Sequence, residues 1–220
     1  MITSTEEDYL KALFNIAQNE RKEMVGTNQI AQKMDTSAAS VTDMLRKLNA
    51  KDLIIYEKYK GAKLSSLGTA QAMILLRKHR LWESFLVDKL GFAWDEVHDL
   101  AEQLEHVRSP ELVNKLDEYL GYPKFDPHGD PIPDLNGTLT IRNQVILSTL
   151  AESEHGTVVG VKKHDKQFLS HLNKVNINIG AEITIIEKFE YDQSCKVMIN
   201  NKMEAVLTAA VCENIFVKPA

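Results

Sequence analysis

Apolar residues recur at intervals of three and four over three short segments of the first fifty residues, which predicts three short helices. Leu10 and Leu13 mark the first segment, Ile30 and Met34 the second, and Leu45 lies in the third. The pattern then changes, because residues 53–56 and 62–65 are rich in strand formers and flank a turn. Three short helices followed by a β-hairpin predict a winged helix-turn-helix over residues 1–65.

Helical spacing continues over residues 66–121, where we expect three further helices. The first is a long helix over about 66–90, which Gly91 ends. The second covers about 94–107 and the third about 110–120, with Pro110 at its start and Gly121 at its end.

Residues 122–147 hold several prolines and glycines, and this composition predicts a Pro-rich linker. Residues 148–220 show a β pattern, with strands expected at 156–161, 181–186, 195–199 and 214–217 and one short helix at 165–173. Several short strands in about 70 residues favour a small barrel. The fold class is therefore mainly α with a small β part.

The composition is that of a folded protein, since 44% of the residues are apolar and 26% are charged. Two cysteines in 220 residues do not form a disulfide scaffold. The first residues lack a basic and then apolar signal-peptide pattern, and no apolar run is long enough for a membrane span. We therefore expect a cytoplasmic protein that does not enter membranes.

The net charge of −5 argues against a nucleic-acid partner, but it is an average over two unlike regions. Residues 36–63 hold six basic and three acidic residues, whereas residues 81–120 hold three basic and ten acidic residues. The predicted winged helix is therefore basic and the middle of the chain is anionic.

A basic winged helix favours binding to double-stranded DNA, with the third helix in the major groove. Its first residues would face base edges and the basic residues of helix and wing would contact phosphates. The alternative is a helix-turn-helix that serves only packing. The candidate base contacts are Ser37, Ala39, Ser40 and Asp43, the candidate phosphate contacts are Thr42, Arg46, Lys47, Lys58, Lys60 and Lys63, and Thr27 completes the set.

The second helix of the middle region carries a group of acids and imidazoles, His98, Glu102, Glu105 and His106, at spacings that share one helical stripe. Carboxylate and neutral imidazole are ligands for divalent first-row metals. The preceding helix adds His79 and Glu83 at i and i+4, which could meet the first group in a bundle. The alternative is a set of exposed polar residues without a metal.

Several segments together resemble the diphtheria toxin repressor family of metal-dependent transcriptional repressors, which includes the manganese transport regulators. The segments that carry this resemblance are Glu7-Asp8-Tyr9-Leu10, residues 53–61, Arg77-Lys78-His79-Arg80-Leu81, Val97-His98-Asp99, Leu104-Glu105-His106-Val107 and residues 127–133. The resemblance implies a helical dimerisation and metal-binding domain over 66–121 and an SH3-like domain over 148–220.

The resemblance also implies two metal sites. One would use Asp8, Glu102, Glu105 and His106. The other would use His79, Glu83 and His98, with further ligands from the linker or from residues 148–220, the tail. Some manganese-responsive members have Cys-Pro-His in the linker; here Asp126 takes the Cys position and His128 follows. The tail candidates are Asp165 and Gln167, with His164 beside them.

The metal is expected to be Mn²⁺, because Asp8 and Glu102 stand where iron-responsive members have Met and Cys, and oxygen ligands suit Mn²⁺. Fe²⁺ is the alternative. Lys11 stands where some manganese regulators have a second carboxylate, which favours a single metal at this site.

The resulting hypothesis is a homodimeric repressor of metal-uptake genes, not an enzyme, with the metal as co-repressor. Without metal, its carboxylates would repel one another. The candidate dimer contacts are Leu86, Leu90, Phe92, Leu112 and Leu116. A metallohydrolase is the alternative from another class, although the chain has no His-Glu-x-x-His motif. A peptide-binding tail is a third alternative, for which the tail has few aromatic residues.

Overall fold

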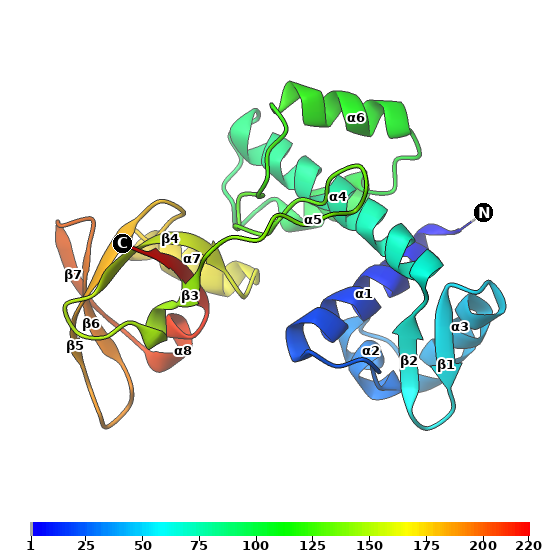
Figure 1. Ribbon diagram of the computed structural model, residues 1–220, viewed down its shortest axis with the longest axis horizontal. Helices are drawn as coiled ribbons and strands as arrows, with labels where there is room; N and C mark the ends of the chain where they lie inside the picture. Colours follow the sequence, from blue (N-terminus) through cyan, green and yellow to red (C-terminus); the bar gives the residue numbers. More distant parts are fainter. Residues whose placement is uncertain (1) are drawn as a thin grey trace. The chain divides into compact units, whose positions relative to one another are not determined.

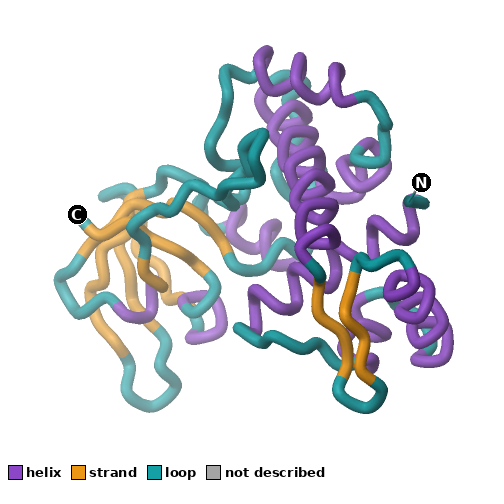
Figure 2. Tube along the Cα trace, turned by 45° about the vertical axis from the view of Figure 1, so that its right-hand side comes forward, coloured by secondary structure: helices purple, strands orange, loops and turns teal. Residues whose placement is uncertain are grey.

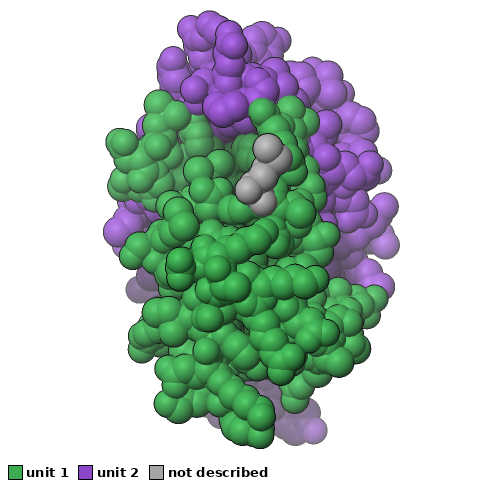
Figure 3. All heavy atoms as spheres, turned by 90° about the vertical axis from the view of Figure 1, so that its right-hand side faces the viewer, with its two compact units in different colours: residues 1–79, 105–108, 133–138 green, residues 80–104, 109–132, 139–220 purple. Residues whose placement is uncertain are grey.

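The computed structural model describes residues 2–220, which divide into two compact units (Figure 3). Unit 1 is built from the residues up to 79 together with 105–108 and 133–138. Unit 2 comprises residues 80–104, 109–132 and 139–220. No helix among residues 2–220 is both long and apolar enough to cross a membrane.

Unit 1 holds the winged helix-turn-helix that the hydrophobic pattern predicts (Figure 1). Ser37 begins the third helix by accepting a hydrogen bond from the Ser40 N–H, and Thr3 with Glu6 forms a capping box on the first. The elements are α1 (Ser4–Glu20), α2 (Thr27–Lys33), α3 (Ala38–Ala50) and the antiparallel pair β1 (Ile54–Glu57) and β2 (Gly61–Leu64).

The core of unit 1 comes from the apolar faces of these helices and the hairpin. Leu10, Leu13, Ile30, Leu45 and Leu48 are fully buried in one cluster. At the start of β2 the backbone of Gly61 has a φ of +113°, and an added Cβ would meet the Val25 carbonyl at 2.1 Å. A glycine is therefore required where the wing returns towards the helices.

Three helices follow the wing: α4 (Ser66–Asp88), α5 (His98–Leu104) and α6 (Pro110–Tyr119). Residues 66–79 of α4 belong to unit 1 and the rest of α4 to unit 2. The predicted helix over 94–107 was too long. Trp94 instead packs into the core of the C-terminal sheet, so the chain there is not helical, and Glu105 and His106 follow the end of α5. The four polar residues therefore do not share one helical stripe.

The C-terminal part of unit 2 is a six-stranded antiparallel sheet with two short helices, coloured by type in Figure 2. The strand order is β3-β8-β4-β5-β6-β7, and no pairing between the edge strands β3 and β7 closes it among the described residues. The elements are β3 (Val145–Ile146), β4 (His155–Val161), α7 (Lys166–Lys174), β5 (Glu182–Lys188), β6 (Cys195–Ile199), β7 (Met203–Leu207), α8 (Ala209–Cys212) and β8 (Ile215–Pro219). A short 3₁₀ turn, Leu147–Thr149, follows β3.

Four of the six strands match predicted strands, whereas β3 and β7 were not predicted from the sequence. The Pro-rich stretch, expected to be a linker, is folded at its start. Phe125 and Pro131 form an isolated β-bridge, and His128 between them is completely buried. This turn therefore places a histidine inside unit 2.

Candidate metal centres and DNA-binding surface

The first candidate metal centre lies in unit 1 and consists of Asp8 on α1 with Glu105 and His106. One ligand atom from each of the three lies within 4.8 Å of the others. His106 Nε2 is 3.1 Å from Asp8 Oδ1 and 4.0 Å from Glu105 Oε1. Two carboxylates and one imidazole that converge in this way suit a divalent cation. Three of the four residues predicted for this site are therefore together.

Glu102, the fourth residue predicted for this site, is not part of that triad. It lies on α5, its side chain is 51% exposed, and its Oε1 is 3.6 Å from Nε2 of His98 on the same helix. The reason is the early end of α5 at Leu104: Glu102 lies within the helix, whereas Glu105 and His106 follow it.

Glu7 and Lys11 on α1 also contact the triad, and sequence reasoning did not place either among the site residues. Glu7 Oε2 is 2.7 Å from His106 Nδ1, which leaves Nε2 facing Asp8. A carboxylate on the far nitrogen of a ligating imidazole fixes the orientation of the ring. Lys11 donates from Nζ to Glu105 Oε1 at 2.6 Å. The usable signal was their position on α1, one residue before Asp8 and three residues after it.

Glu105 is fully buried, and both of its oxygens have partners. Besides Lys11 on Oε1, His79 Nδ1 lies 2.5 Å from Oε2. Burial lowers the pKa of the nearby Lys78 ammonium, and the charges of Glu7 and Glu105 oppose that change. The expected repulsion among bare carboxylates is therefore not what the structure shows, since Glu105 is paired with a cation.

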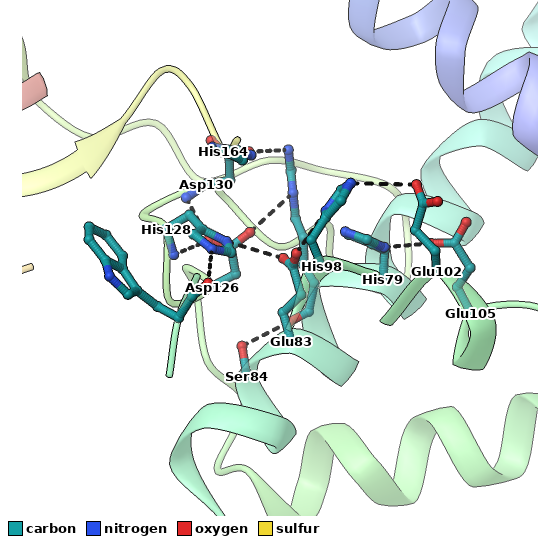
Figure 4. Close-up of polar contacts among 12 residues, drawn as sticks. His79, Glu83, Ser84, His98, Glu102, Glu105, Asp126, His128, Asp130 and His164 are labelled. Carbon is teal, nitrogen blue, oxygen red and sulfur yellow. Dashed lines mark hydrogen bonds and ion pairs between the residues drawn. The ribbon is translucent and has the colours of Figure 1, made fainter. Parts of the chain in front are cut away.

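The second candidate metal centre lies in unit 2 and consists of Glu83 on α4 with Asp126 and His128 from the Pro-rich turn. All three are buried, and Figure 4 shows Glu83 and His128 facing each other. His128 Nε2 donates a hydrogen bond to the backbone carbonyl oxygen of Trp94, 2.7 Å away, because a carbonyl oxygen can only accept. His128 Nδ1 lies 3.5 Å from Glu83 Oε2.

His128 Nδ1 is buried without a hydrogen-bond partner among the described residues. Because Nε2 donates to the Trp94 carbonyl, Nδ1 is the ring nitrogen that faces the carboxylates, and it can bind a cation once its proton is lost. Buried polar atoms are nearly always paired, so an orphan of this kind indicates a missing ligand. The residues therefore fit a divalent cation held by oxygen and nitrogen atoms.

The electrostatics of this centre reflect two acids and an imidazole in one buried space. Burial, and then the charges of Asp130 and Glu83, raise the pKa of Asp126 to about 7. Burial alone would lower the pKa of His128, but the facing Glu83 carboxylate and Asp126 outweigh it and raise that pKa to about 9. Arg80 Nε, 3.5 Å from Asp126 Oδ2, acts in the opposite direction on Asp126.

Other predicted ligands lie around this centre. His98 Nδ1 is 3.3 Å from Glu83 Oε1. His79, also predicted for this centre, belongs to unit 1, where it contacts Glu105. From the tail, the imidazole of His164 stacks on that of His128 with ring centroids 4.8 Å apart. Burial lowers the pKa of His164, and the neighbouring His128 adds to the effect against the opposing charge of Asp130.

The two tail residues favoured from the sequence are exposed. Asp165 caps α7, its Oδ1 accepting the Phe168 N–H at 2.9 Å. Gln167 lies in the first turn of α7. The tail therefore brings His164, and not these two, against the imidazole of the centre.

The predicted DNA-binding residues lie on an exposed surface of unit 1, on α3 and the wing. Ala39 and Lys47 are exposed, while several others have partners within the chain. Ser37 Oγ is 2.9 Å from Ser40 Oγ, and Thr42 Oγ1 donates to Ala38 O. The remaining pairs are Arg46 with Asp43, Lys60 with Glu57, Lys63 with Glu23 and Lys58 with the Tyr59 ring, and Thr27 begins α2.

Family models of iron-dependent repressors match the chain in two places. The N-terminal DNA-binding domain matches residues 1–62, and the metal-binding and dimerisation domain matches residues 65–134. A solved structure titled as a manganese-dependent transcriptional repressor in complex with manganese is similar over 98% of this chain and 100% of that chain, with 31% identity and a TM-score of 0.87. The chain belongs to the diphtheria toxin repressor family. This family comprises metal-dependent, DNA-binding transcriptional repressors.

Two curated proteins are similar to parts of this chain. The diphtheria toxin repressor of Corynebacterium jeikeium is 33% identical over 135 residues, which are 61% of this chain and 55% of that protein. The chain thus matches about half the length of this curated relative. A probable metal transport system membrane protein of Chlamydia trachomatis is 49% identical over 70 residues, 32% of this chain and 16% of that protein. The FeoA domain model matches residues 145–219.

Proposed function

We propose that this chain is a transcriptional repressor that binds double-stranded operator DNA when a divalent cation occupies its metal centres. The observation that carries the proposal is the triad of Asp8, Glu105 and His106, which joins a helix of the winged helix-turn-helix to residues far along the chain. α1 contacts α2, and α2 contacts α3, the helix that would enter the major groove.

The cation, when bound, supplies positive charge shared by α1 and residues 105–106. Asp8 and His106 then hold α1 in one position, Glu7 keeps the His106 ring oriented, and α2 and α3 follow α1. The cation can favour DNA binding only by binding the DNA-competent arrangement more tightly. By linkage, DNA must strengthen cation binding by the same factor.

We propose Mn²⁺ as the co-repressor, with Fe²⁺ as the alternative. Both triads offer carboxylate oxygen and imidazole nitrogen, and both cysteines, Cys195 and Cys212, are buried in the core of the C-terminal sheet. Oxygen-rich sites suit Mn²⁺, whereas sulfur would favour softer ions. For the second centre we propose Glu83, Asp126 and His128, with His98 and His164 adjoining them.

We propose that the repressor acts in the cytoplasm as a homodimer. Of the apolar residues predicted for the dimer contact, Leu86 and Leu116 belong to the core of unit 2, whereas Leu90, Phe92 and Leu112 are exposed. Leu90 and Phe92 lie in the segment between α4 and α5, and Leu112 lies on α6. Exposed apolar residues in a dimerisation domain suit a contact with a second copy. For the open C-terminal sheet we propose an SH3-like fold with a regulatory role.

Genes for metal uptake are the proposed targets. Support comes from the Chlamydia trachomatis relative, in which a segment similar to part of this chain belongs to a probable metal transport system membrane protein. Repression by Mn²⁺ would then lower Mn²⁺ uptake when the ion is abundant. A hydrolytic function is less well supported, because the three residues of the second centre and Glu105 of the first are buried, and a substrate needs access.

The test is DNA retardation by the full chain, titrated in parallel with Mn²⁺, Fe²⁺ and Zn²⁺. Promoter fragments of metal-uptake genes serve as probes and coding fragments as controls. We expect retardation only with metal, at the lowest concentration for Mn²⁺, and its loss in Asp8→Asn. Glu204→Gln, which removes an exposed carboxylate paired with Lys196 in the tail, should behave as wild type.

Two results would contradict parts of the proposal. Retardation that needs no metal would remove the co-repressor role, and a response to Fe²⁺ alone would overturn the argument from ligand hardness. Glu102→Cys adds a check, because a thiolate in place of this carboxylate should move the preference towards Fe²⁺ and Zn²⁺ only if Glu102 reaches the metal.

A further inference from the structure

Lys11 forms a buried ion pair with a carboxylate of the first triad. Its Nζ is 2.6 Å from Oε1 of Glu105, which is the same oxygen that lies 4.0 Å from His106 Nε2. Glu105 is 0% exposed and Lys11 is 9% exposed, so water screens this pair little. The two residues are 94 positions apart in the sequence, and the fold alone brings them together.

The charge of the triad depends on this pair. Asp8 and Glu105 carry two negative charges, which a divalent cation would neutralise. With the Lys11 ammonium on Glu105, one of these charges is already compensated. A cation that takes Glu105 Oε1 as a ligand must break the Lys11 bond and tolerate an ammonium beside it, both of which oppose binding.

We infer that Lys11 is a built-in competitor of the metal: its ammonium occupies Glu105 in the metal-free protein, and its displacement sets the metal concentration at which the first centre fills. This inference rests on the proposed function of the triad. It assigns to Lys11 the regulation of metal sensitivity, and it replaces carboxylate repulsion as the description of the metal-free state.

A purely structural role for Lys11 makes a different prediction. A buried ion pair that only supports the fold would cost stability when broken, and metal binding would weaken with the loosened site. A competitor also costs stability when removed, but metal binding becomes tighter, because the cation then meets an uncompensated carboxylate. The sign of the change in Mn²⁺ affinity therefore separates the two roles.

The experiment measures Mn²⁺ binding to the full chain without DNA, following the electron paramagnetic resonance signal of free Mn²⁺. The variants are Lys11→Met, which keeps the length of the side chain and removes its charge, and Lys11→Gln, which keeps a hydrogen-bond donor for Glu105. The matched control is Lys51→Met. Lys51 follows α3, and its Nζ lies 2.7 Å from Oε1 of Glu6 on α1, so this variant removes an ion pair to α1 that lies outside the triad.

We expect Lys11→Met to bind Mn²⁺ about tenfold more tightly at one site, as loss of a competing charged hydrogen bond implies. The gain should be smaller in Lys11→Gln, absent in Lys51→Met, and absent when Asp8→Asn accompanies Lys11→Met. Thermal unfolding should show that Mn²⁺ raises the Tm more in Lys11→Met than in wild type.

Unchanged or weaker binding in both Lys11 variants, with wild type binding Mn²⁺, would overturn the inference and leave the proposed function standing. No binding by wild type or variants would overturn both. Binding by the Lys11 variants alone would support the inference while contradicting a co-repressor role of the first centre in the natural chain.

Discussion

Removing the carboxylate of Glu7 tests whether His106 acts as an oriented metal ligand. In Glu7→Ala, His106 Nδ1 loses its partner at 2.7 Å, and the ring is free to turn Nε2 away from Asp8. A hydrogen bond to a charged group contributes about 1.5–3 kcal/mol. The side chains of Glu7 and His106 are 17% and 22% exposed, so we take the lower end. The expected loss in Mn²⁺ affinity is then about tenfold.

The assay is the same Mn²⁺ titration followed by DNA retardation at fixed Mn²⁺. Glu7→Gln keeps an acceptor for the ring and should lose only about threefold. Glu20→Gln is the control, because it removes an exposed carboxylate from the other end of α1, where Glu20 pairs with Lys22. Equal Mn²⁺ affinity in Glu7→Ala and wild type would refute the role of Glu7 and weaken the assignment of His106 as a ligand.

Three further predictions concern other parts of the molecule. In the metal-free chain, the folded-state pKa of His128 at about 9 and of Asp126 at about 7 both lie above their ordinary values. The free energy of unfolding should therefore fall as pH rises from about 4 to 9, and His128 alone should contribute up to about 3 kcal/mol of this fall. His128→Gln should flatten the upper part of the curve when Tm is measured against pH in the presence of a chelator. Lys47→Ala should weaken DNA binding on all sequences alike and lower the slope of log affinity against log salt by about one in retardation assays; a loss confined to one sequence would contradict a phosphate contact. Leu112→Asp should shift sedimentation from dimer to monomer, whereas an unchanged sedimentation coefficient would exclude this face from the dimer contact.

The winged helix-turn-helix could be predicted from the sequence because its elements carry local signals. Leu10 and Leu13 on α1 lie at helical spacing, as do Leu45 and Leu48 on α3, and Ser37 marks the start of α3. α5 was harder, because the polar residues after Leu104 continue a helical spacing that the chain does not follow. No proline or glycine directly follows Leu104 to end the helix. Before the helix begins, Trp94 packs into a core formed by residues much later in the sequence.

The edge strand β7 was missed for a related reason. Glu204 and Val206 are exposed and Met203 and Ala205 only partly buried, so the strand lacks the apolar alternation that marks β5 and β6. An edge strand is defined by its pairing with a neighbour, here β6, and a pairing leaves little trace in the strand's own sequence.

The metal centres were only partly predictable. The residue types were visible, but the meeting of Asp8 with Glu105 and His106 depends on the fold, and spacing along the chain does not encode it. Family resemblance supplied that link, and it also supplied Glu102, which the structure leaves exposed on α5 beside His98. In the sequence, Lys11 is only a departure from the family pattern, because its contact with Glu105, 94 positions away, depends on the fold.

In the proposed mechanism, metal and DNA binding are coupled through the triad that includes Asp8 on α1. The most direct test measures the Mn²⁺ affinity of the full chain alone and then with a saturating DNA duplex, selected from random sequence in the presence of Mn²⁺. DNA should tighten Mn²⁺ binding by the same factor by which Mn²⁺ tightens DNA binding, and Asp8→Asn should abolish both effects. An Mn²⁺ affinity that is the same with and without DNA would contradict this mechanism.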